Sequence, residues 1–201
     1  MTIDAWLKQQ KRPPFWQILS KELSFSISVG RVYNYKGKHP DGREHDFWVL
    51  NNRCDWVQCL AITEQRELVL VSQYRAGSDS ITLELPGGGV DQGEDPQSAL
   101  FRELREESGY TGDTPILLNS CYSNPGMQTN RVYFYLLQNC HKQFDVQFDP
   151  AEDITTQCLP LTLLDDAINA QLFQHAITLT GVLLLQRWLS EHDLCMANNV
   201  G

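Results

Sequence analysis

The first third of the chain alternates apolar and polar positions with a period of two. Between residues 23 and 29, apolar residues alternate with serines, a pattern typical of a half-buried strand. The His-Pro-Asp-Gly stretch at 39–42 predicts a turn, after which residues 47–50 return as a second strand. We expect a small antiparallel sheet here, preceded by a short helix or arm within residues 1–19.

The rest of the chain mixes short apolar runs with longer periodic segments. The runs predict strands at 57–63, 68–74, 82–85, 116–122, 132–138 and 154–159. The periodic segments predict helices over residues 161–170 and 171–189, besides one described below. This order favours an α/β/α sandwich with a mixed sheet. We therefore expect an N-terminal segment, 1–54, and a main domain, 55–201.

One helix has clear signals at both ends. Asp95 can cap it, Pro96 suits the first helical position, and Gly109 suits the left-handed residue that follows a helix. Within it, an apolar stripe is predicted to face the core: Ala99, Leu100, Phe101 and Leu104. On another face, three carboxylates stand at i, i+3 and i+4, namely those of Glu103, Glu106 and Glu107.

These carboxylates repel one another and lie beside the negative end of the helix dipole, so a positive charge should compensate them. Arg102 and Arg105 can do part of this, and Arg102 can pair with Glu106 at i+4. A solvated, salt-bridged helix is thus one interpretation. A divalent cation is the other, and Mg²⁺ is the natural choice because it prefers oxygen ligands and bridges carboxylates to phosphates.

The loop before this helix, residues 85–94, holds four glycines. Glycine allows the backbone to approach a ligand closely, so a carbonyl here could join a metal's coordination shell. Taken alone, a glycine-rich turn is more often a plain connection between a strand and a helix. Its position directly before the carboxylate helix favours the functional interpretation.

Loop and helix together form a specific spaced motif. It runs from Gly88 through five residues to Glu94, then seven residues to Arg102-Glu103-Leu104-Arg105-Glu106-Glu107-Ser108-Gly109. This segment resembles the Nudix box of the Nudix hydrolase family at every specified position. The resemblance implies a Nudix-type α/β/α sandwich and hydrolysis of a nucleoside diphosphate linked to another moiety, with Mg²⁺ or Mn²⁺ as cofactor.

The resemblance also assigns roles to residues. It implies that Glu103 and Glu107 are the main metal ligands, with Glu106 and the Gly87 carbonyl as further ligands. Glu94 and Arg102 are expected to hold the loop and the helix together. Glu106 is also a candidate for the catalytic step.

Two flanking segments resemble those of the ADP-ribose and nucleotide-sugar pyrophosphatases within the family. Upstream, Gln73-Tyr74-Arg75 is followed by Leu83-Glu84-Leu85-Pro86, and the resemblance makes Arg75 a phosphate or ribose contact. A surface charge is the equal alternative for Arg75. Downstream, Pro125 stands where that subfamily places a proline, although an Asn-Pro-Gly turn explains it too. No acidic residue follows within 127–131, which leaves nucleotide sugars other than ADP-ribose open.

Further roles follow from the same resemblance. The subfamily often has an acidic loop that supplies a catalytic base or another metal ligand, for which Glu152 is the first candidate and Asp149 the second. A surface loop without a role is the alternative. Phe47 and Trp48 are candidates to stack on the nucleobase, against an alternative of interface or core packing. Similar enzymes exchange the N-terminal sheet between subunits, so we expect a homodimer.

Composition narrows the class of protein. The net charge of -9 offers no polybasic attraction for nucleic acid or membranes, so a polyanionic substrate must be held by metals and local arginines. The start of the chain lacks the pattern of a signal peptide, and no apolar run is long enough to span a bilayer. We expect a cytoplasmic protein with reduced cysteines, since the six cysteines show no CxxC pair. His175 is interpreted as structural.

Three functions remain after the sequence is read. The favoured one is Mg²⁺-dependent hydrolysis of a nucleotide sugar to a nucleoside monophosphate and a sugar phosphate. Another is hydrolysis of a different diphosphate, such as a dinucleoside polyphosphate or coenzyme A. The last is a ligand-sensing Nudix module without catalysis, which the complete set of box glutamates disfavours.

Overall fold

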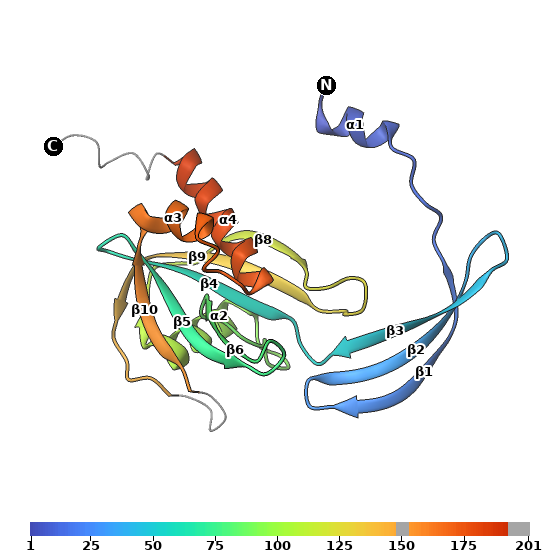
Figure 1. Ribbon diagram of the computed structural model, residues 1–201, viewed down its shortest axis with the longest axis horizontal. Helices are drawn as coiled ribbons and strands as arrows, with labels where there is room; N and C mark the ends of the chain where they lie inside the picture. The colour runs from blue at the N-terminus through green and yellow to red at the C-terminus, as the bar shows by residue number, and fades with distance from the viewer. Residues whose placement is uncertain (148–152, 193–201) are drawn as a thin grey trace. The chain divides into compact units, whose positions relative to one another are not determined.

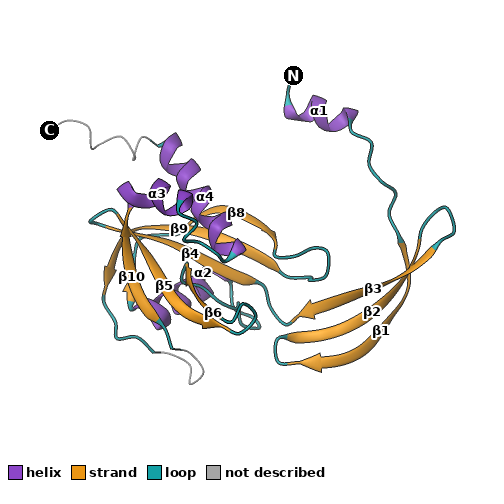
Figure 2. Cartoon of the chain, viewed as in Figure 1, coloured by secondary structure: helices purple, strands orange, loops and turns teal. Residues whose placement is uncertain are grey.

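The computed structural model describes residues 1–147 and 153–192. By its internal contacts the chain divides into two compact units. The first unit comprises Met1–Arg53 and Asn124–Thr129, and the second comprises Cys54–Ser123 with the described part of Asn130–Gly201. Figure 1 follows the chain through both units, and Figure 2 shows their helices and strands.

The first unit is a helix followed by an antiparallel sheet. Helix α1 spans Ile3–Gln9, and strands β1, β2 and β3 span Gln17–Ile27, Gly30–Lys38 and Glu44–Asn52. The strands pair in the order β1-β2-β3, which confirms the expected small antiparallel sheet but adds β2, a strand that the sequence analysis did not predict. Residues 124–129 lie along the end of β3, where Leu50 donates its N–H to the Met127 carbonyl at 2.7 Å.

Strand β1 departs from the half-buried strand that the alternation predicts. Two register shifts interrupt its pairing with β2. Its apolar side chains are exposed in the single chain, to 54% for both Leu23 and Phe25 and 40% for Ile27. The N-terminal sheet therefore presents an apolar surface that its own unit does not bury.

The second unit contains a mixed sheet between helices. Its strands are β4 (Trp56–Thr63), β5 (Glu67–Arg75), β6 (Ser80–Glu84), β7 (Tyr110–Thr111), β8 (Ile116–Tyr122), β9 (Arg131–Lys142) and β10 (Thr155–Pro160). Its helices are α2 (Pro96–Ser108), the 3-10 turn η1 (Leu161–Leu163), α3 (Leu164–Asn169) and α4 (Ala176–Glu191). Strands β4 and β9 are parallel, and the other described pairs are antiparallel.

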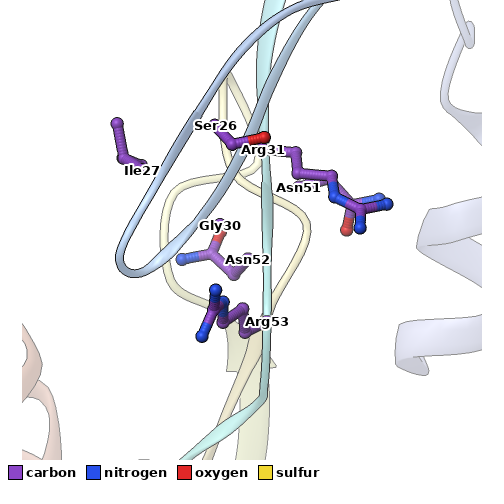
Figure 3. A pocket seen from close by; sticks show the side chains of 7 residues that line it. All are labelled: Ser26, Ile27, Gly30, Arg31, Asn51, Asn52 and Arg53. Carbon is purple, nitrogen blue, oxygen red and sulfur yellow. The ribbon is translucent and has the colours of Figure 1, made fainter.

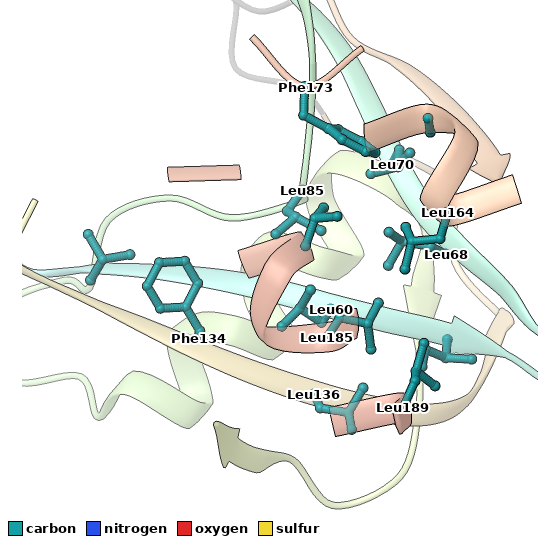
Figure 4. Packing of buried hydrophobic residues seen from close by; sticks show 14 residues of the cluster. Leu60, Leu68, Leu70, Leu85, Phe134, Leu136, Leu164, Phe173, Leu185 and Leu189 are labelled. Carbon is teal, nitrogen blue, oxygen red and sulfur yellow. The ribbon is translucent and has the colours of Figure 1, made fainter. Parts of the chain in front are cut away.

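Two apolar cores lie on opposite faces of this sheet and confirm the predicted sandwich. On one face, α2 packs its predicted stripe, with Ala99, Leu100 and Leu104 fully buried. On the other face, α3 and α4 cover residues of β4, β5 and β9 (Figure 4). Gly181 of α4 lets that helix approach closely, because a Cβ there would meet Leu85 at 2.5 Å.

One sequence expectation for the second unit needs correction, and one short strand was missed. The final helix begins at Ala176, not at residue 171, because Gln171 has a φ of 57° and His175 is extended at the N-cap. The short strand β7 was not predicted, since two residues are too few to show a pattern. Among the described residues, no helix is both long and apolar enough to cross a membrane.

The sheet splits near the loop that leads to α2. The first half of β5 pairs with β4, at Ile62 and Leu68, whereas its second half pairs with β6. Residues 86–88, which follow β6, take the place of β5 beside β4. The N–H groups of Cys59 and Val57 in β4 donate to the carbonyls of Pro86 and Gly88 at 2.8 and 2.9 Å. The split thus places the glycine-rich loop between β4 and helix α2, with Gly87 bonded to Glu107 of that helix.

Candidate active site

Helix α2 has the ends that the sequence predicts. The Asp95 side chain accepts hydrogen bonds from the N–H groups of Gln97 and Ser98, at 3.0 and 3.1 Å, and so caps the first turn. Gly109 ends the helix with a φ of 75°, in the left-handed region that favours glycine. A Cβ at Gly109 would also overlap the Phe144 carbonyl. Because α2 ends at Ser108, Glu103, Glu106 and Glu107 lie in its last two turns.

The glycine-rich loop and α2 meet through backbone and carboxylate groups. The Gly87 N–H donates to the Glu107 carboxylate at 2.8 Å, and Glu107 is only 5% exposed. A side chain at Gly87 would overlap the Val57 carbonyl of β4. At Gly88, a Cβ would lie 2.5–2.6 Å from the carboxyl atoms of Glu103. Close approach of the sheet backbone therefore requires glycine at Gly87, whereas a side chain at Gly88 would displace the Glu103 carboxylate.

Arg102 is the centre of the charged network on α2. It donates to Glu94 at 3.2 and 3.0 Å, to the Gly89 carbonyl at 2.8 Å, to Glu103 at 2.8 Å and to Glu106 at 3.4 Å. The hydrogen bond from Arg102 is the main cause that lowers the pKa of Glu94, and Glu94 in turn raises the pKa of Arg102. Arg102 thus joins the loop to the helix, and its predicted pair with Glu106 is present.

The box carboxylates supply oxygen ligands of the kind that Mg²⁺ prefers. In the part of the chain that the structure describes, however, no three acidic, histidine or cysteine side chains form a ready-made metal cage. Glu103 and Glu106 contact Arg102, whereas Glu107 contacts the Gly87 amide. The residues fit a hard divalent cation by donor type, and Gly88 leaves room for the Glu103 carboxylate against the backbone. The donor atoms of these carboxylates therefore fit a divalent cation, and Arg102 contacts two of the three carboxylates.

The chain after β9 returns to the end of α2. The N–H groups of Gln143 and Phe144 donate to the Gly109 carbonyl at 2.9 and 3.0 Å, and the Gln147 N–H donates to the Glu106 carbonyl at 2.9 Å. Residues 143–147 are therefore fastened to the helix that carries the glutamates. The two candidate bases predicted next, Asp149 and Glu152, lie outside the described residues.

Arg75 lies at the end of β5 and makes a bidentate ion pair with Glu84 of β6. Its Nε and Nη2 atoms donate to the two Glu84 oxygens at 2.8 Å each. Glu84 is 1% exposed and also contacts His175 at 3.0 Å. Sequence reasoning named Arg75 but missed Glu84 and its link to His175. The signal was present, because an acidic residue between the buried-type residues Leu83 and Leu85 requires a partner.

In the first unit, the two candidate stacking residues differ in their surroundings. Phe47 packs against Trp16 and His45, with ring centroids 5.2 and 4.8 Å apart. Trp48 points to the other face of β3, as the next residue of a strand must, and is 53% exposed. Of the two, Trp48 is the one with a ring surface available to a ligand in this unit.

Pro125 lies in an exposed turn of the same unit. The Asn124 carbonyl accepts from the N–H groups of Met127 and Gln128, at 3.0 and 2.7 Å. The turn is thus closed by backbone hydrogen bonds, with Pro125 itself exposed. The Asn-Pro-Gly turn predicted from the sequence is confirmed.

The first unit also contains a cavity of about 290 Å³ at the end of the β1–β2 hairpin (Figure 3). Its lining residues are Ser26, Ile27, Gly30, Arg31, Asn51, Asn52 and Arg53. In Figure 3 the Arg31 and Asn51 side chains extend to one side of β3, and Arg53 lies on the other side with Asn52. The two guanidinium groups therefore do not converge, and no box residue lines the cavity.

A comparison with known families identifies the domain that contains the carboxylate helix and its loop. Residues 52–178, which include the whole motif, match the family described as the NUDIX domain. The chain belongs to the Nudix family. It is a Nudix hydrolase, an enzyme of the pyrophosphohydrolase class, and members of this family generally use divalent metal ions.

Relatives with known names are consistent with this membership. The chain is 26% identical over 147 residues to the ADP-ribose pyrophosphatase of Bacillus subtilis (strain 168), covering 73% of this chain and 78% of the relative. It is 25% identical over 178 residues to the ADP compounds hydrolase NudE of Escherichia coli (strain K12), covering 89% and 88%. A crystal structure described as an ADP compounds hydrolase superposes with a TM-score of 0.81 at 21% identity, covering 91% and 98%. That structure confirms the fold.

Proposed function

We propose that the protein hydrolyses the diphosphate linkage of nucleotide sugars, with ADP-ribose as the first substrate to test. The products would be a nucleoside monophosphate and a sugar phosphate. The observation that carries the proposal is the complete set of box glutamates beside the glycine-rich loop, where Arg102 contacts Glu103 and Glu106 and the Gly87 N–H contacts Glu107. The names of the two relatives support an ADP-containing substrate.

In this proposal Mg²⁺ is held by Glu103, Glu106, Glu107 and the Gly87 carbonyl, with Mn²⁺ as a possible substitute. When bound, the cation would offset the charge of the diphosphate and lower the pKa of a water molecule. The Glu107 carboxylate already has its position set by the Gly87 N–H. Arg102 keeps Glu94 and the Gly89 carbonyl as partners when it releases Glu103, so the loop stays joined to the helix.

We propose candidate substrate contacts for each unit separately. Arg75 contacts the diphosphate, since a guanidinium group matches phosphate oxygens and its side chain is 46% exposed. Trp48 stacks on the nucleobase, and Phe47 supports the strand from its other face. Pro125 shapes the turn that lies along β3. The proposed proton acceptor is one of Glu106, Asp149 and Glu152.

The proposed assembly is a homodimer formed through the N-terminal sheet. Its β1 strand exposes Leu23, Phe25 and Ile27, and Trp6 of α1 is 44% exposed. Apolar surface of this extent is typical of an interaction site rather than of an isolated monomer. This exposed apolar surface is the basis on which we propose the dimer.

A substrate screen tests the function directly. Purified protein is incubated with ADP-ribose, other nucleotide sugars, diadenosine polyphosphates and coenzyme A, each with Mg²⁺ or with excess chelator, and products are separated by chromatography. Glu64→Gln, at an exposed turn, is the matched control for Glu107→Gln. We expect AMP and ribose 5-phosphate from ADP-ribose, only with metal, and full activity in the control. Turnover confined to polyphosphates or coenzyme A would reassign the substrate, and none at all would refute the function.

A further inference from the structure

Leu85, the residue that leads into the glycine-rich loop, is held by helix α4. Its N–H donates to the side-chain hydroxyl of Thr178 at 3.3 Å. Thr178 lies in the first turn of α4 and is fully buried, and Leu85 is only 1% exposed. Because a buried backbone N–H requires a partner, this hydroxyl fixes where Leu85 can lie relative to the helix.

The side chain of Leu85 contacts the same helix. Gly181 lies three residues after Thr178, and a Cβ added there would meet Leu85 Cδ1 at 2.5 Å and Phe134 at 3.2 Å. Helix α4 therefore holds Leu85 at two points. The Thr178 hydroxyl binds its backbone, and the space that Gly181 leaves accommodates its side chain.

The chain runs from Leu85 to Gly87 through a proline, which has no N–H to donate. The next backbone donor is thus the Gly87 N–H, which donates to Glu107 of α2 at 2.8 Å. Helices α4 and α2 cover opposite faces of the sheet. The start of the loop is therefore held by a side chain from each face, Thr178 on one and Glu107 on the other.

The Thr178 hydroxyl is itself held in place. His175, the N-cap residue of α4, has its Nδ1 atom 3.2 Å from Thr178 Oγ1 and 3.0 Å from the carboxylate of Glu84. Glu84 is the last residue of β6 and directly precedes Leu85. The oxygen that accepts the Leu85 N–H thus belongs to a buried polar network, and such networks restrict the movement of their members.

We propose that Thr178 is a positioning residue, which sets the place of the Gly87 carbonyl by holding the Leu85 N–H and so determines the affinity for Mg²⁺. The proposal rests on the proposed function, because it takes the Gly87 carbonyl as a ligand of the cation. Peptide units are planar and proline fixes its φ, so a shift of Leu85 is passed on to Gly87. Mg²⁺ requires nearly ideal octahedral geometry, which makes its binding sensitive to small shifts of one ligand.

Calorimetry with Mg²⁺ alone tests the effect on affinity without substrate. Thr178→Val keeps the shape of the side chain and removes the hydroxyl, so the Kd for Mg²⁺ should rise about tenfold, which corresponds to the loss of one hydrogen bond. Thr178→Ser keeps the oxygen and should bind Mg²⁺ as the wild type does. An unchanged Kd in Thr178→Val would overturn the proposal, as would a Kd in Thr178→Ser as high as that in Thr178→Val.

Thr180→Val is the matched control on the same helix. Thr180 is exposed, and its hydroxyl donates to the Ala176 carbonyl at 2.9 Å rather than to the loop. Its replacement removes the same group from α4 without touching Leu85. The control should bind Mg²⁺ as the wild type does, and a Kd raised as much as in Thr178→Val would overturn the proposal.

Amide hydrogen exchange in the metal-free protein separates positioning from a general loss of stability. The Leu85 and Gly87 N–H groups should exchange about tenfold faster in Thr178→Val, whereas the Leu136 N–H in β9 should not change. An equal rise at all three would show a structural role only and would overturn the proposal. If Thr178→Val does not fold, Thr178→Ala removes the same oxygen and leaves room for a water molecule at Leu85, and the same outcomes apply to it.

Turnover then links this proposal to the function and keeps the two apart. The Mg²⁺ concentration that gives half-maximal hydrolysis of ADP-ribose should rise about tenfold in Thr178→Val, with kcat at saturating Mg²⁺ within about threefold of wild type. If the wild type hydrolyses no nucleotide sugar, the proposed function fails, and calorimetry and hydrogen exchange still decide the role of Thr178. A wild type that binds no Mg²⁺ would overturn the positioning role.

Discussion

Gly88→Ala is the sharpest test of the candidate active site, because it changes no charge and no residue of α2. The added Cβ would lie 2.5–2.6 Å from the three carboxyl atoms of Glu103. Ordinary contact begins near 3.4 Å, so the carboxylate must move by about 1 Å, and a misplacement of this size at a reacting centre costs about 100-fold in rate. We therefore expect kcat/KM with Mg²⁺ and ADP-ribose to fall about 100-fold.

The same substitution should leave the fold intact. Gly88 is not among the residues with a positive φ, and the atoms that its Cβ meets belong to the flexible end of a side chain. Replacing glycine at a compatible position stabilises a protein by about 0.4–1 kcal/mol through the unfolded state. The melting temperature without metal should thus stay the same or rise slightly.

Gly77→Ala is the matched control, since nothing lies within 4 Å of its added Cβ. It should leave both the melting temperature and the activity close to those of the wild type. Mg²⁺ affinity measured by calorimetry should fall in Gly88→Ala and not in Gly77→Ala. Wild-type metal affinity and activity in Gly88→Ala would refute the assignment of Glu103 to the metal.

Other substitutions test the remaining parts of the argument. Glu107→Gln should abolish metal-dependent turnover in the product assay but shift the melting temperature by only a few degrees, because the amide oxygen can still accept the Gly87 N–H. Glu84→Gln should lower the free energy of unfolding by about 2 kcal/mol at neutral pH. The folded-state pKa of Glu84 is lowered, so this contribution to stability is present above the ordinary glutamate pKa of 4.5 and is lost as the pH falls below that value. The denaturation curves of the wild type and Glu84→Gln should therefore converge in acid. Phe25→Glu should give a monomer by light scattering, and a dimer that persists would place the interface elsewhere. Trp48→Ala should raise KM for ADP-ribose without lowering the melting temperature, whereas Phe47→Ala should lower the melting temperature, because Phe47 packs on an aromatic cluster.

Local signals in the sequence predicted the box helix well. Asp95 and Pro96 act on the first turn and Gly109 on the last, each in a strongly preferred role, so both ends of α2 are where they were expected. The start of the final helix was predicted five residues too early, because residues 171–175 contain helix-compatible side chains. Only the backbone shows that Gln171 adopts a positive φ and postpones the start of α4.

Long-range pairing limited what could be predicted about the site. Glu84, Arg75 and His175 lie on three different elements, and no spacing rule connects residues 84 and 175. Arg75 could therefore be named as a candidate, but its anchor could not. Strand alternation predicts that Phe47 and Trp48 point to opposite faces of β3. It does not show which of the two is covered, and the contact between Trp16 and Phe47 in the structure supplies that information.

Helix α4 also determines where this protein can be shortened. The family match ends at residue 178, three residues into the helix, yet Val182, Leu185 and Leu189 lie beyond it and are at most 1% exposed. Removing a large buried side chain costs about 2–5 kcal/mol, and three such losses are comparable to the whole stability of a typical domain, about 5–15 kcal/mol. An expression boundary drawn at the end of the family match should give insoluble protein, and one drawn after Glu191 should not.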